Sequence, residues 1–137
     1  MHEARRRRRF WLAVALLSAL ACSSPNRGHW QGTFEGGVDG TMEFTVNARG
    51  TKADGRITGA TRRGEKFEAK FEGSLNQGFL NARFEGSGQT GVGLPAGFRG
   101  ELQGDLEQGE AAGSWKVDLI QVRVHYEGKW AATQVVE

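Results

Sequence analysis

Between residues 28 and 137, apolar and polar residues alternate over most of the chain. Trp30 and Phe34 lie on one side of this alternation, and Gln31 and Thr33 lie on the other. A period of two predicts strands that bury one face and solvate the other, as antiparallel sheets do. No stretch of this part has a helical period, so we expect an all-β fold. The alternating runs span residues 30–35, 42–48, 56–60, 66–72, 80–85, 98–105, 114–119, 122–127 and 130–136.

Glycine-containing dipeptides supply the positive φ that tight turns between strands need. Eight or nine strands joined by such turns predict an antiparallel up-and-down barrel of about eight strands. A two-sheet β-sandwich is the alternative. The predicted turns are at Asp39-Gly40, Arg49-Gly50, Asp54-Gly55, Arg63-Gly64, Gly73-Ser74, Gln77-Gly78, Gln108-Gly109 and Glu127-Gly128.

The triplet Phe-Glu-Gly occurs at residues 34–36, 71–73 and 84–86, each time at an expected strand end. Duplication of a hairpin is one explanation. The simpler explanation, which we favour, is that a strand end suits an inward aromatic, an outward charge and a turn glycine.

The apolar positions predict a core rich in large aromatic side chains. Small residues such as Gly32, Ala69 and Gly100 share their parity, and small beside large is how a tapering barrel packs. We therefore expect a mostly filled interior, with binding at the barrel mouth near Gly86 to Gly97 or on the outer face. The aromatic residues predicted to face inward are Trp30, Phe34, Phe44, Phe67, Phe71, Phe84, Phe98, Trp115, Tyr126 and Trp130.

The first residues have the layout of a secretory signal peptide. Five arginines, Arg5 to Arg9, precede twelve uncharged residues, Phe10 to Ala21. A positive region, a short apolar region and a small residue, in this order, are typical of such peptides. A spanning helix needs about 20 apolar residues, so we expect residues 1–21 to be a cleaved signal. This layout also explains the arginines without a nucleic-acid partner.

The junction Ser18-Ala19-Leu20-Ala21-Cys22 resembles the lipobox of bacterial lipoprotein precursors. The resemblance implies that a diacylglycerol joins the Cys22 thiol, that a peptidase cuts after Ala21, and that the new amine is acylated, for example with palmitate. The family prefers leucine three residues before the cysteine, where this chain has Ala19. Ala19 and Ala21 also fit the A-x-A rule of ordinary signal cleavage, so a plain secreted protein with a free thiol is one alternative, and an uncleaved anchor is another.

Lipidation accounts for the only cysteine of the chain, which has no partner for an intramolecular disulfide. Residues 22–27 then form a short lipidated linker, and residues 28–137 form a β-barrel domain. The resemblance implies a cell-envelope protein that contacts the membrane through its lipid anchor at Cys22. Ser23 fits the serine that accompanies outer-membrane sorting in Gram-negative lipoproteins. We therefore expect the domain at the outer membrane, facing the periplasm.

Removal of the signal reverses the charge balance. Residues 22–137 carry thirteen Lys and Arg against fifteen Asp and Glu, a net charge near −2, whereas the whole chain has +2. The basic character of the whole chain therefore predicts no nucleic-acid partner.

The residues predict neither an enzyme nor a cofactor or metal site. Residues 86–91 read Gly-x-Gly-x-x-Gly, but a phosphate site needs a helix to follow, which Gly93-Leu94-Pro95 does not allow. His29 and His125 have outward parity and lack the companions of a metal site. No serine has the context of an activated nucleophile. The carboxylates alternate with Lys and Arg, as in cross-strand charge pairs.

Three Gly-x-Trp triplets, at residues 28–30, 113–115 and 128–130, favour the barrel over the sandwich. The first resembles the Gly-x-Trp of the calycins, which are the lipocalins, fatty-acid-binding proteins and avidins. The resemblance implies that Trp30 plugs the barrel bottom and that a basic residue of the last strand, here Lys129, packs across it.

Two functions remain open at this point. We favour a non-enzymatic, lipid-anchored envelope lipoprotein that acts as a structural or interaction module with an envelope protein partner. The alternative, implied by the calycin resemblance, is a carrier of a small apolar ligand. An empty interior would favour the carrier.

Overall fold

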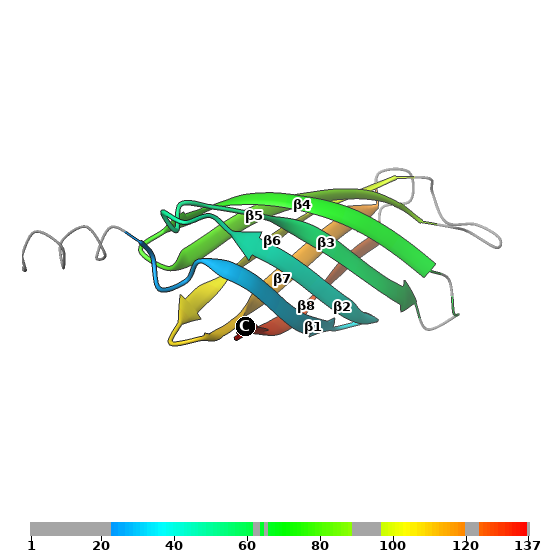
Figure 1. Cartoon of the computed structure of the whole chain (residues 1–137). Helices are drawn as coiled ribbons and strands as arrows, with labels where there is room; N and C mark the ends of the chain where they lie inside the picture. Colours follow the sequence, from blue (N-terminus) through cyan, green and yellow to red (C-terminus); the bar gives the residue numbers. More distant parts are fainter. Residues whose placement is uncertain (1–22, 62–63, 65, 89–96, 120–123, 137) are drawn as a thin grey trace, which may run out of the picture.

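The computed structural model describes residues 23–61, 64, 66–88, 97–119 and 124–136, and the regular elements of these residues are all strands (Figure 1). The all-β prediction is therefore confirmed. The strands are β1 Gly28–Glu35, β2 Val38–Val46, β3 Lys52–Thr61, β4 Lys66–Asn76, β5 Phe79–Gly88, β6 Phe98–Glu107, β7 Glu110–Leu119 and β8 Val124–Gln134.

The sheet closes on itself. Each strand pairs antiparallel with the next along the chain, and β8 pairs with β1. This order confirms the up-and-down barrel of eight strands and excludes the two-sheet sandwich. Parts of the runs 122–127 and 130–136 belong to one strand, β8, which spans residues 124–134. The turn predicted at Glu127-Gly128 is wrong, because Gly128 pairs with Trp115 inside the β7–β8 ladder.

Two of the hairpin turns are the two-residue connections that the sequence predicts. Gln77 and Gly78 join β4 to β5 with φ angles of 51° and 82°, and Gln108 and Gly109 join β6 to β7 with 52° and 78°. Two successive positive φ angles match the right-handed twist of the strands they connect. The β1–β2 turn instead uses Gly36 and Gly37, which also have positive φ.

Three more predicted turns are wrong, because Gly40, Gly55 and Gly73 lie inside β2, β3 and β4. A Cβ atom at Gly55 would lie 2.6 Å from the Cβ of Phe44 on the neighbouring strand, which is closer than real Cβ atoms approach. These glycines therefore allow close approach of side chains across the sheet and do not turn the chain.

The Phe-Glu-Gly triplets do not share one position in the barrel. Residues 34–36 leave β1 for a turn, as predicted, whereas residues 71–73 lie within β4 and residues 84–86 within β5. The expectation that all three end a strand is therefore wrong.

The inward side chains form one apolar core, and none of the buried side chains in the described part of the chain is polar or charged. Of the ten aromatics predicted to face inward, eight are buried, while Phe67 and Tyr126 are half-buried and pack against the core. Trp30 stacks on Phe44 with centroids 5.7 Å apart and planes 5° apart. Phe34 contacts Phe67 and Trp115 with centroids 6.0 and 5.9 Å apart. Aromatic rings in mutual contact thus occupy much of the interior.

The indole N–H groups of the core tryptophans all donate to backbone carbonyls. Trp130 Nε1 donates to the carbonyl of Gln103 at 2.9 Å, and Trp115 Nε1 donates to that of Glu35 at 3.1 Å. Trp30 Nε1 donates to a carbonyl of the N-terminal segment, described below. Each large side chain is therefore buried without an unpaired donor, which would be costly in an apolar core.

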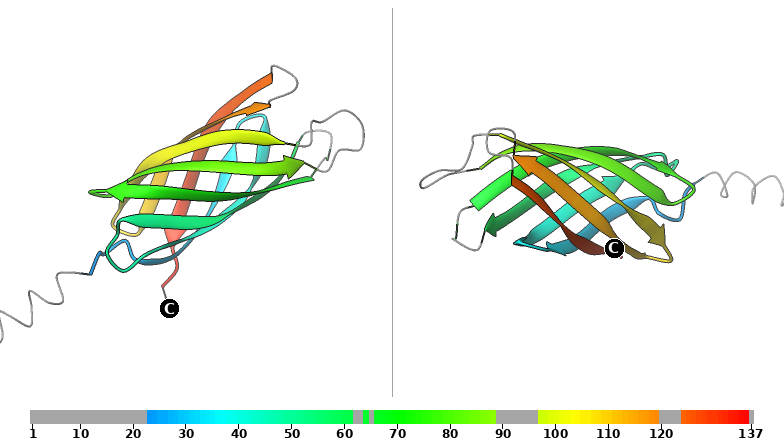
Figure 2. Two further views of the ribbon diagram at one scale, coloured as in Figure 1. Left: turned by 90° about the horizontal axis from the view of Figure 1, so that it is seen from above. Right: turned by 180° about the vertical axis from the view of Figure 1, so that it is seen from behind.

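The up-and-down course gives the barrel two different ends (Figure 2). The turn end contains residues 23–27, the β2–β3, β4–β5 and β6–β7 turns, and the residues after β8. The loop end contains the β1–β2 turn and the far ends of β3, β5 and β7.

Candidate functional site

The predicted lipidation site, Cys22, and the predicted cleavage site, Ala21, lie outside the described residues, as does the signal peptide, residues 1–21. Lipidation therefore stays a prediction. The described chain begins with Ser23, the next residue after this cysteine.

Residues 24–27 are bonded to the turn end of the barrel. The Ser24 N–H donates to the carbonyl of Ala48, beside the β2–β3 turn, at 2.9 Å. On the other side, the amide of Gln134 in β8 donates to two carbonyls of the segment at 3.0 and 2.7 Å. The segment therefore crosses the turn end from the β2–β3 turn to β8.

Trp30 lies beneath this segment. It is completely buried, and its Nε1 donates to the carbonyl of Asn26 at 2.9 Å. The tryptophan of the first Gly-x-Trp triplet thus lies in the core at the turn end, which is the position predicted for it.

The role predicted for Lys129 is wrong. In the β1–β8 ladder, Lys129 pairs with Glu35 at the opposite end of β1, and its side chain is exposed. Gln134 pairs with Trp30 instead. The register therefore keeps the only lysine of β8 away from the tryptophan, and Gln134 holds the segment above it.

The loop end is where the predicted mouth lies. Residues 89–96 of that predicted site fall outside the described residues, while Gly86 and Phe98 flank it on β5 and β6. Phe98 is buried against Phe67, with centroids 5.7 Å apart and planes 88° apart. The half-buried rings of Phe67 and Tyr126 make this the end at which the aromatic core comes nearest to solvent.

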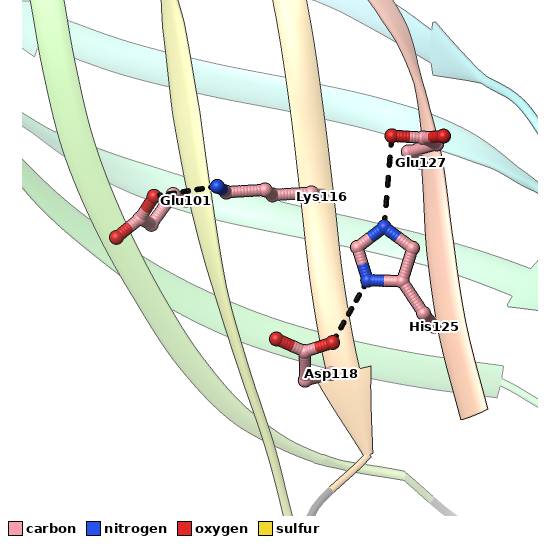
Figure 3. A network of polar contacts seen from close by, with 5 residues as sticks. All are labelled: Glu101, Lys116, Asp118, His125 and Glu127. Atoms are coloured by element: carbon pink, nitrogen blue, oxygen red, sulfur yellow. Dashed lines mark hydrogen bonds and ion pairs between the residues drawn. The ribbon is translucent and has the colours of Figure 1, made fainter. Parts of the chain in front are cut away.

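His125 forms a charged cluster on the outer face near the loop end (Figure 3). Its Nδ1 lies 2.8 Å from Asp118 Oδ1 on β7, and its Nε2 lies 3.6 Å from Glu127 Oε2. The hydrogen bond to Asp118 raises the pKa of His125 above 6.5, desolvation opposes this, and Glu127 adds to the rise. Lys116 and Glu101 form a neighbouring ion pair at 3.5 Å.

This cluster is exposed, which confirms the outward position predicted for His125. Other charges on the outer face also pair across strands, for example Arg99 with Glu85 at 3.4 Å. Exposed pairs of this kind contribute about 0–1 kcal/mol each. The arrangement fits the predicted cross-strand charge pairs and contains no nucleophile aligned with a base.

The outer charges are unevenly distributed around the barrel. On β6, β7, β8, β1 and β2, nine carboxylates accompany three Lys or Arg, whereas β3, β4 and β5 carry four carboxylates and five Lys or Arg. The side formed by β6 to β2 is therefore acidic.

The acidic side is also hollowed where its outward side chains are small. An open depression of about 750 Å³ lies over β6, β7, β8 and β1, with Ala112, Ser114 and Ala131 among its lining and Phe79 and Lys129 beside them. This concavity lies outside the sheet, on the outer face of the barrel.

Within the described ranges, no group of three His, Cys, Asp or Glu side chains could hold a metal ion. The same residues include no helix long and apolar enough to cross a bilayer. No protein-family model matches the chain, and no curated protein matches it in sequence. The residues and the fold therefore carry the functional argument.

Proposed function

We propose that this protein is a non-enzymatic lipoprotein of the cell envelope, anchored by lipid at Cys22, that acts through the outside of its barrel as a structural or interaction module. The packed core is the observation that carries this proposal. Aromatic side chains such as Trp30, Phe44 and Phe34 fill the interior of the barrel. The polar and charged groups that a partner could contact therefore lie on the outer surface and not inside.

The lipobox resemblance supports the anchor. A single acyl chain gives marginal membrane binding, whereas two or more chains hold a protein stably. A lipidated and acylated Cys22 supplies more than one chain. The outer membrane, with the domain facing the periplasm, is the location that Ser23 favours. The acidic side formed by β6 to β2 favours a positively charged envelope partner.

The anchor is tested by Cys22→Ser in the protein's own host, followed by detergent phase separation. The wild type should enter the detergent phase, and the variant should enter the aqueous phase. Ser23→Ala, one residue away, is the matched control and should remain in the detergent phase. A wild type already found in the aqueous phase would refute the anchor.

The interaction role is tested by native mass spectrometry of the delipidated protein purified from its own host. A stable protein partner that dissociates at high salt is the expected result. A retained small molecule without a protein partner would contradict this role and favour a carrier.

A carrier of a small apolar ligand is the second candidate, because Phe67 and Tyr126 leave the aromatic core half-buried at the loop end. An apolar dye or fatty acid that binds at micromolar concentration and quenches the core tryptophans would support it. Such quenching requires a site inside the barrel, so its absence would count against the carrier.

A further inference from the structure

We infer that the turn end of the barrel rests against the lipid surface, with the loop end directed away from the membrane. The inference rests on the proposed lipid anchor and adds an orientation to it. A flexible linker would let the barrel rotate freely above the membrane. The bonds of residues 24–27 remove most of that freedom.

The first bond lies almost at the anchor. The amide of Ser24 is bonded to Ala48 at 2.9 Å, so only Ser23 separates the anchored cysteine from a residue fixed to the barrel. Two residues span at most about 7 Å. The β2–β3 turn must therefore lie at the level of the lipid headgroups.

Further bonds hold the segment across its whole length. The backbone N–H of Asn26 donates to Ser24 Oγ at 3.1 Å, and the backbone carbonyl of Asn26 accepts from the indole N–H of Trp30. Gln134 then donates to the carbonyls of Pro25 and Arg27. Since Trp30 is a fully buried core residue, the segment is bonded to the interior of the barrel as well as to the β2–β3 turn.

Three exposed cations of the turn end suit lipid headgroups. Arg49 and Lys52 lie in and after the β2–β3 turn and are exposed, as is Arg27 at the end of the segment. These three cations lie where headgroup phosphates would be. Glu107 and Glu110 flank the β6–β7 turn of the same end, so contact through the β2–β3 side is favoured.

The geometry places the two ends of the barrel in different environments. The eleven residues of β4, at a strand tilt of about 40°, rise about 28 Å. The loop end, with the half-buried Phe67 and Tyr126, is then held at about this distance from the headgroups. Partners or ligands in the periplasm reach that end without obstruction by the membrane.

A matched pair of labels tests this orientation. Lys52 and Lys66 are exposed lysines that begin β3 at the turn end and β4 at the loop end. Lys52→Cys and Lys66→Cys each introduce one free thiol, because the diacylglycerol occupies the thiol of Cys22, the only natural cysteine. The acylated full-length product is labelled with a fluorophore and reconstituted in vesicles of phosphatidylethanolamine and phosphatidylglycerol that contain a lipid with a nitroxide headgroup.

We expect quenching several-fold stronger at position 52 than at position 66. Insertion of about ten Gly and Ser residues between Ser23 and Ser24 adds a flexible span of about 17 Å and should abolish most of the difference. The same residues appended after Glu137 serve as the control and should preserve it.

The outcomes separate the two proposals. Equal quenching at both positions in an acylated protein overturns the orientation alone. A difference that survives the insertion also overturns it, because the tether then does not set the orientation. A chain that carries no acyl group overturns the anchor and the orientation together.

Discussion

Replacement of Trp30 by alanine is the most direct perturbation of the barrel core. The side chain is completely buried, stacks on Phe44 at 5.7 Å, and donates a hydrogen bond of 2.9 Å to Asn26. We expect Trp30→Ala to lower the free energy of unfolding by a large fraction of its total, and to loosen the N-terminal segment at the same time.

The magnitude follows from these contacts. Removal of a buried tryptophan costs about 3–5 kcal/mol, which includes the lost ring contacts and the cavity that remains. The hydrogen bond to Asn26 accounts for about 0.5–1.5 kcal/mol of net stability. Domains have total stabilities of about 5–15 kcal/mol, so this one change removes about a fifth of the total or more. Trp30→Phe keeps a ring over Phe44 and removes the donor, so its loss should be clearly smaller.

Urea unfolding of the delipidated domain, followed by far-UV circular dichroism, measures these losses. Phe79→Ala is the control, because Phe79 is an aromatic strand residue that is 42% exposed. Its loss should stay below about 1 kcal/mol. A loss of less than about 1 kcal/mol for Trp30→Ala would refute the burial argument and the resemblance to calycins that depends on it.

Three further predictions follow from single contacts. Gly113→Ala should cost about 1–3 kcal/mol, because its Cβ would clash with the carbonyl oxygen of Gln103 and lie 2.6 Å from the Cα of Gly104 on β6. Gly97→Ala should stay within about 0.5 kcal/mol, because no atom of the described residues would lie within 4 Å of its Cβ; urea midpoints compare the two variants. The raised pKa of His125 means that its stabilising effect is present below pH 6.5 and disappears as pH rises through the raised folded-state value. The difference in melting temperature between wild type and His125→Gln should therefore be larger at pH 5 than at pH 9, and an equal difference would contradict this. Gln134→Ala should cost about 1 kcal/mol and speed amide exchange in residues 24–27, while unchanged exchange would show that Gln134 does not hold them.

The alternation of residues predicted the strands well, because burial of one face of a closed sheet imposes a period of two on every strand. The inward aromatics followed from the same parity. Parity also placed His125 on the outer face, where the structure has it. These features are local, so they can be recognised in a single sequence.

Glycine has two uses in this fold, and the sequence alone does not separate them. Gly78 and Gly109 have positive φ in turns, whereas Gly55 and Gly73 lie in strands opposite a neighbouring Cβ. In both uses, glycine follows a polar or small residue. The sequence therefore predicts turns at four glycines that in fact lie inside strands. Only the register of the partner strand shows which use applies.

The bonded N-terminal segment had no sequence signal that connects it with β8. Ser24 to Arg27 are polar or turn-forming residues, which predicted a linker. The bonds from Gln134 join residues 109 and 107 positions apart, and such pairs depend on barrel closure. The misplaced role of Lys129 has the same origin, because its position depends on the β1–β8 register.

The closing ladder between β1 and β8 also determines how this chain reaches its native state. Seven of the eight ladders join neighbouring strands and can form as hairpins, which are kinetically fast local contacts. The eighth requires the first and the last strand to meet, so it forms only after the complete chain is available. Until then, β1 and β8 are edge strands with unpaired backbone groups, which are templates for aggregation. A chain that loses the eleven residues of β8 would therefore remain an open sheet with two unprotected edges.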